Sequence, residues 1–220
     1  MGRGPVGAPA LVKYNDQSIS AITDIAASAK DAMVLIKTVT ASSSATVSFV
    51  DGSDDVVLDN TYPIYRFVWI NAHASDQSGD GSELAFDVSI NTGSDYDTIA
   101  KCTTYFVSIH AENDATPALA YTAAADNSSG TGTQYLSVDN DADNDASNSG
   151  EMWLFNPSDT TYVKHFIAKN NYMHSNPSST NNFVGGYLNT TSAIDALQFS
   201  FTGSTTIESG TFKLYGIKDS

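Results

Sequence analysis

The sequence predicts an all-β protein, an antiparallel jelly-roll-like β-sandwich with a short N-terminal arm. The composition favours strands, because Thr, Ser, Val, Ile, Tyr and Phe are abundant while Lys, Arg, Glu and Leu are few. Turn-forming Asn, Asp, Ser and Gly cluster between the apolar runs. About ten short apolar runs follow one another with no helical pattern between them, which indicates a sandwich or barrel rather than a parallel βαβ fold.

Residues 1–32 are expected to form an arm or anchor, and residues 33–220 one sandwich domain. Gly and Pro are dense in the first nine residues and exclude regular structure there. Ile19, Ile22 and Ile25 then recur at three-residue spacing, so a short helix, an ordered extended arm and a floppy terminus are all compatible with this segment. No signal-peptide pattern is present, and no apolar run is long enough to cross a membrane.

Two of the predicted strands have informative patterns. Residues 64–72 are apolar on both faces, which predicts a central strand covered on two sides. Residues 83–90 alternate, which predicts one face on the core and one face in water. The remaining strands are predicted at residues 33–39, 46–50, 103–110, 134–138, 151–155, 162–168, 183–188, 196–201 and 211–217.

Net charge and cysteine content restrict the binding partners and the cellular compartment in which the chain folds. The formal net charge is −15, so the surface repels phosphate backbones and nucleic-acid binding is disfavoured. Cys102 is the single cysteine, which excludes an intrachain disulfide and favours folding in a reducing cytoplasm. Because Cys102 opens an apolar run, we expect a buried small hydrophobic side chain rather than a nucleophile.

An acidic segment between two predicted strands is the candidate metal site. Alternating carboxylates resemble the start of a calcium loop, since Ca²⁺ prefers several oxygen ligands within a short span. The segment lacks the Gly and Glu that complete an EF-hand loop, so a calcium site and a solvated loop both stay open. The acidic residues within 51–55 and 76–83 are weaker candidates for a calcium site. No other cofactor is predicted. The candidate ligands are Asp139, Asp141, Asp143 and Asp145.

No catalytic signature is present, so we expect a protein that is not an enzyme. The four histidines are scattered without metal-binding spacing, and no nucleophile-elbow motif occurs. His165 is expected in the core or at an interface. Tyr121, Tyr172 and His174 lie in or beside polar stretches, where exposed rings with Asn and Asp neighbours indicate either a glycan-binding surface or a protein interface.

Several stretches resemble a family of virion proteins from tailed bacteriophages, common in marine phages including those of cyanobacteria. The similarity begins at residues 10–19 and 37–49 and covers nearly the whole chain, apart from residues 1–9. Its motifs mark strands and turns rather than an active site. They comprise Tyr65, Phe67 and Ile70, residues 89–96, a Gly-Glu-Met-x-Leu-Phe-Asn-Pro segment at 150–157, and residues 189–194 and 207–217.

The resemblance implies a virion structural protein made in the cytoplasm of a bacterial host. The expected type is a tail fibre, a receptor-binding protein or another particle-surface component. Its expected partners are other virion proteins of the tail or capsid, further copies in a homotrimer, and a host surface glycan, but no nucleic acid and no membrane. The alternatives are a capsid decoration protein that stabilises the head, and a carbohydrate-binding module or depolymerase.

Overall fold

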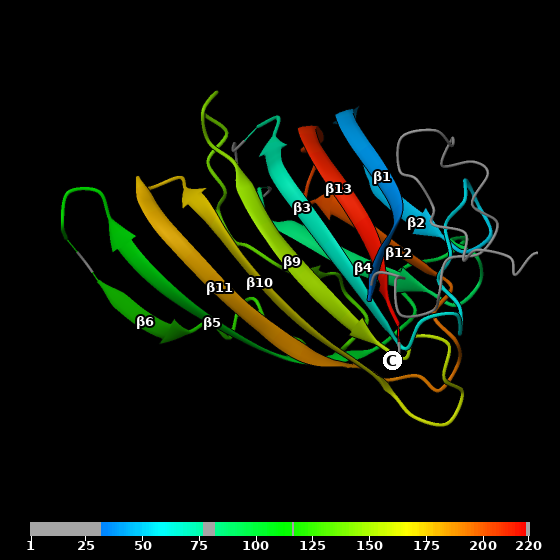
Figure 1. Ribbon diagram of the computed structural model, residues 1–220. Coiled ribbons are helices and arrows are strands. Elements are labelled where there is room, and N and C mark those ends of the chain that lie inside the picture. The colour runs from blue at the N-terminus through cyan, green and yellow to red at the C-terminus, as the bar shows by residue number, and fades with distance from the viewer. Residues whose placement is uncertain (1–31, 77–81, 116, 219–220) are drawn as a thin grey trace, which may run out of the picture. The chain divides into compact units, whose positions relative to one another are not determined.

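The computed structural model describes residues 32–76, 82–115 and 117–218, and every regular element within these ranges is a strand. The prediction of an all-β antiparallel sandwich is confirmed, since two antiparallel sheets pack against each other (Figure 1). Apart from Ala32, the predicted arm at 1–32 lies outside the described residues, and so does the Ile19–Ile25 pattern.

The larger sheet has nine strands in the order β1-β13-β3-β9-β10-β11-β5-β6, with β7 also paired to β5. Every pairing in it is antiparallel. The bounds are β1 Met33–Ser44, β3 Ile64–Ala74, β5 Lys101–Ala111, β6 Ala118–Tyr121, β7 Ser128–Gly130, β9 Asn148–Phe155, β10 Lys164–His174, β11 Ser178–Leu188 and β13 Ile207–Ile217.

The smaller sheet has four strands in the order β2-β12-β4-β8 and lies behind the larger sheet in Figure 1. Its bounds are β2 Val47–Val50, β4 Leu84–Ser89, β8 Gln134–Tyr135 and β12 Ala196–Phe201. The larger sheet therefore has an inner face turned toward the smaller sheet and an outer face turned away from it.

Aromatic rings join the two sheets. Phe199 on β12 contacts four other rings at centroid distances between 5.3 and 6.5 Å, and three of them come from β3 and β13 of the larger sheet. All five rings are almost completely buried, so this cluster holds the sheets together at one place. The partners of Phe199 are Phe49, Phe67, Trp69 and Phe212.

A buried ion pair joins the sheets at a second place. Lys101 at the start of β5 lies 2.7 Å from Asp87 of β4, and both side chains are shielded from solvent. The Lys101 ammonium group also donates to the backbone carbonyls of Ile99, Thr131 and Gly132. Burial raises the pKa of Asp87 to about 6, although Lys101 lowers it.

The prediction for residues 83–90 is wrong, and the buried position of Asp87 in this pair is part of the reason. Both faces of β4 are buried, since Ala85, Asp87 and Ser89 are as inaccessible as the core-facing positions. The prediction for residues 64–72 is also wrong in part. β3 is central in its sheet, but only its inner face is buried, and Ile70 on the outer face is 41% exposed.

Chain segments without strand structure cover the inner face of β10 and β11. Residues 136–141 lie against these strands, where Asn182 donates to the Leu136 carbonyl and Tyr172 donates to the Val138 carbonyl. Asn148 accepts hydrogen bonds from the Trp69 indole at 2.7 Å and from Asn170 at 3.1 Å. Asn182 and Tyr172 thus satisfy backbone carbonyls of the covering segment, whereas Asn148 satisfies buried side chains.

We predict that Phe199→Ala lowers the free energy of unfolding by about 3–5 kcal/mol, because it removes the ring that both sheets share and leaves a cavity. Urea unfolding followed by fluorescence measures the change. Tyr162→Ala is the control, since Tyr162 is 72% exposed and its loss should change stability by about 0.5 kcal/mol at most. Equal effects of the two substitutions would contradict this view of the core.

We also predict that Lys101→Met costs about 3–5 kcal/mol, because it leaves the Asp87 carboxylate buried without its partner. The double variant Lys101→Met/Asp87→Leu should recover most of that loss, since no unpaired charge is left. A double-mutant cycle in urea checks this. Additive losses would show that the two side chains do not act as a pair.

Candidate functional site

Antiparallel pairing arranges side chains of the outer face in rows that cross several strands. One row combines an acidic, a basic and three aromatic side chains. They come from five different strands, so the residues are distant from one another in the sequence. The register pairs the members of this row in the order Val68, Glu151, Lys169, Phe183, Phe106 and Tyr121.

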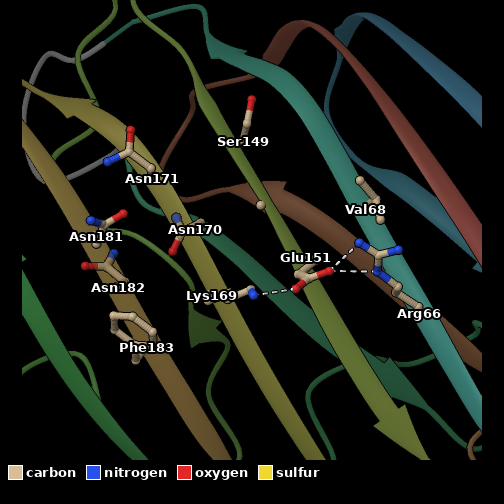
Figure 2. Close-up of a pocket in the computed structure, with 11 residues that line it drawn as sticks. Arg66, Val68, Ser149, Glu151, Lys169, Asn170, Asn171, Asn181, Asn182 and Phe183 are labelled. Atoms are coloured by element: carbon tan, nitrogen blue, oxygen red, sulfur yellow. Dashed lines mark hydrogen bonds and ion pairs between the residues drawn. The ribbon is translucent and has the colours of Figure 1, made fainter.

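Glu151 lies between two cations. Lys169 is its register partner in the same row, and Arg66 belongs to the adjacent row, where it pairs with Trp153. Its carboxylate accepts a hydrogen bond from Arg66 Nε at 2.7 Å, and Lys169 Nζ lies 2.9 Å from its other oxygen (Figure 2). Arg66 comes from β3, Glu151 from β9 and Lys169 from β10, so the trio depends on the register of three adjacent strands. The Glu151 side chain is 13% exposed, whereas that of Lys169 is 62% exposed and accessible to a ligand.

Burial raises the pKa of Glu151, but the hydrogen bonds from Lys169 and Arg66 together outweigh burial and hold the pKa below its ordinary value. Glu151 is therefore ionised at neutral pH. The trio has one negative and two positive groups, so its net charge is positive, in contrast to the chain as a whole.

An outer groove of about 390 Å³ opens beside this trio (Figure 2). It combines charged groups with amides and one aromatic ring. Of the amides, Asn171 and Asn181 are exposed and can both donate to and accept from hydroxyl groups. Its lining consists of Arg66, Val68, Ser149, Gly150, Glu151, Lys169, Asn170, Asn171, Asn181, Asn182 and Phe183.

An aromatic hollow of about 320 Å³ lies on the other side of Glu151 and Lys169, which line both depressions. Its lining also includes Trp153, Phe155 and Ile167. The Arg66 guanidinium lies 5.3 Å from the centroid of the Trp153 ring, which holds this ring beside the charged trio. Apolar rings and polar groups are thus adjacent on one sheet face.

Of the three predicted contact residues, Tyr172 is not at the surface. The prediction of an exposed ring is wrong, because Tyr172 is 3% exposed and its hydroxyl donates to the Val138 carbonyl at 2.7 Å. Burial also raises its pKa to about 12. His174 is half-buried, and its ring accepts a hydrogen bond from the Asn176 backbone in the turn between β10 and β11.

Tyr121 is exposed and belongs to the same face as the groove. It ends β6 at 56% exposure, and its register partner Phe106 stacks on Phe183 of the groove with a centroid distance of 5.0 Å. His165, expected in the core or at an interface, is exposed on the outer face and is therefore not a core residue. Cys102, expected to be buried, is half-buried there.

The structure does not gather the predicted calcium ligands. Asp141 is buried and accepts a hydrogen bond from the Asp143 backbone, while Asp139, Asp143 and Asp145 are exposed. Within residues 32–76, 82–115 and 117–218, no group of three or more His, Cys, Asp or Glu side chains is arranged to hold a metal ion. The Asp139 and Asp141 backbones instead hydrogen-bond to the β10–β11 hairpin.

Sequence reasoning missed Arg66, Glu151, Lys169, Asn181 and Phe183, which lie on four different strands. One feature of the sequence could have indicated Glu151. Glu151 and Glu208 are the only acidic residues in the nine strands of the larger sheet, although the chain contains 25 acids. An isolated acid between strands that carry only bases marks an unusual position.

No protein-family model, curated protein sequence or solved structure matches this chain. The resemblance to phage virion proteins accordingly stays a prediction. In the part of the chain that the structure describes, there is no helix with the length and apolar character needed to span a bilayer.

We predict that Glu151 titrates below the value of about 4.3 for a free Glu side chain. Because its folded-state pKa is lowered, its contribution to stability is present at higher pH and is lost as the pH falls through the folded-state value. Carboxyl chemical shifts measured by NMR check this. In Lys169→Gln the pKa should rise, whereas Lys218→Gln, outside the groove, should leave it unchanged.

Proposed function

We propose that this chain is a surface component of a phage virion that binds host saccharide through the outer face of its nine-stranded sheet. The observation that carries the binding role is the juxtaposition of the outer groove and the aromatic hollow around Glu151 and Lys169. The resemblance of the sequence to phage virion proteins supports the setting.

Sugar rings have apolar faces and polar rims, and a site for them needs both kinds of contact. Trp153 and Phe155 supply flat apolar surface in the hollow, while Asn171, Asn181 and Ser149 supply hydrogen-bonding groups in the groove. The two depressions share Glu151 and Lys169 along their boundary, so one oligosaccharide could contact both. An open sheet face suits an extended chain of sugars better than a small enclosed substrate.

Binding without turnover fits this face best. Most glycoside hydrolases use a pair of carboxyl groups about 5–9.5 Å apart. Among the residues that line the groove and the hollow, Glu151 is the single carboxylate, and two cations hold it ionised. A lone ionised acid orients neighbouring bases but does not make an acid and base pair.

Weak single sites become effective when several are presented together. Shallow open grooves give modest affinity because they desolvate little of the ligand. A homotrimer would display three copies of the face, and linked sites gain avidity without any new contact. We therefore include a trimer in the proposal, and multi-angle light scattering on the purified chain tests it.

Saccharide binding is tested on an array of neutral and acidic bacterial glycans. Trp153→Ala and Phe183→Ala should each weaken binding about tenfold or more, because each removes a ring from the centre of the face. Tyr162→Ala is the matched control, since it removes an exposed ring outside both depressions. Equal binding by all three variants would rule out this face as the site.

The setting is tested separately. Mass spectrometry of purified virions, from the phage whose genome encodes the chain, should detect it, and antibody labelling should place it on the particle surface. Its absence from such virions would refute the virion role. The saccharide site would still be decided by the glycan-array result alone.

A further inference from the structure

We infer that the saccharide recognised by the outer face carries a carboxylate, as uronic and sialic acids do, and that Lys169 contacts this group. The inference rests on the proposed saccharide-binding function and specifies the class of ligand. It is carried by the distribution of charge over the sheet and by the geometry of the Glu151 trio.

Charge is strongly segregated in this chain. The formal net charge is −15, yet the nine strands of the larger sheet contain six Lys or Arg residues and only two acids. Two of these cations, Lys101 and Lys164, are buried. Lys213, Arg66 and Lys169 lie on the outer face, and the register places Lys213 beside Val68, next to Glu151.

The outer face is therefore the place where an anionic group meets the least repulsion and the nearest cations. Charges separated by more than about 8–10 Å are largely screened at physiological ionic strength, so local groups decide what binds in the groove. The overall charge still opposes dense polyanions at longer range. A short saccharide that carries one or a few carboxylates satisfies both conditions.

Lys169 has the capacity for this contact. Its ammonium group carries three donors, and its side chain stays 62% exposed while it pairs with Glu151 at 2.9 Å. Glu151 fixes the position of the ammonium group and competes with the ligand for it. Arg66 is less available to a ligand than Lys169, because two of its nitrogens lie within 2.7 Å of the same Glu151 oxygen.

This arrangement predicts opposite effects for two conservative substitutions. Lys169→Gln removes the cation and should weaken binding of a carboxylated sugar about tenfold, the usual effect of losing a charge-assisted hydrogen bond. Glu151→Gln removes the competing carboxylate and should strengthen binding about threefold, since it relieves repulsion across a solvent-exposed site. A purely structural role for the trio would make both variants bind worse.

The experiment measures binding of trigalacturonate and of its methyl ester by isothermal titration calorimetry, with 3′-sialyllactose and its methyl ester as a second matched pair. We expect the acid of at least one pair to bind about tenfold more tightly than its neutral counterpart. Lys218→Gln serves as the charge-matched control outside the groove, and circular dichroism verifies that every variant is folded.

Three results would overturn the inference. If neutral probes bind as tightly as acidic ones, or if all glycans bound on the array are neutral, recognition of a carboxylate is wrong, whereas saccharide binding is still supported. If Glu151→Gln weakens binding as much as Lys169→Gln, direct contact by Lys169 is wrong. Binding to no glycan at all overturns the inference and the proposed saccharide site together.

Discussion

The contact between a nine-stranded sheet and a four-stranded sheet is the constraint on which the rest of this structure depends. Phe199 fixes where the sheets meet, because its ring packs among rings from β3 and β13 on the opposite side. Elsewhere the smaller sheet is too narrow to cover its partner. The inner face of β10 and β11 is instead covered by segments such as residues 136–141, and this changes which side chains can face inward.

A strand that packs against another sheet needs apolar side chains, whereas one that packs against a loop must also satisfy the backbone of that loop. Tyr172 on β10 and Asn182 on β11 follow this rule, since each donates to a backbone carbonyl within residues 136–141, while Phe166 and Val184 continue the apolar core. Each of these strands thus has an apolar half and a polar half.

That division explains which parts of the fold could be predicted from the sequence. β12 was predicted with its bounds correct, because Leu197 and Phe199 alternate with polar residues and face a sheet. The second half of β10 was not predicted as a strand, since Asn170-Asn171-Tyr172 lacks an apolar period even though it is part of a regular strand. β6 and β7 were missed, because neither short edge strand buries a side chain completely.

The candidate site was less predictable for a related reason. Tyr121 was identified as a surface ring, but its connection to Phe183 passes through Phe106 and requires the pairing of β6, β5 and β11. Glu151 and Lys169 are 18 positions apart and become neighbours only through the β9–β10 register. Periodicity shows which face a residue occupies, and it does not show which residue of another strand lies beside it.

The same dependence on register explains why the outer face can be both open and specific. Its charged trio is positioned by backbone hydrogen bonds of three adjacent strands rather than by loops, so its geometry is as rigid as the sheet. Arg66 lies on Trp153 and pairs with Glu151, which joins the polar groove to the aromatic hollow. Within the trio Lys169 is the most exposed member, at 62% against 28% for Arg66 and 13% for Glu151. A surface built in this way can keep a cation accessible on an acidic protein without losing it to an internal partner.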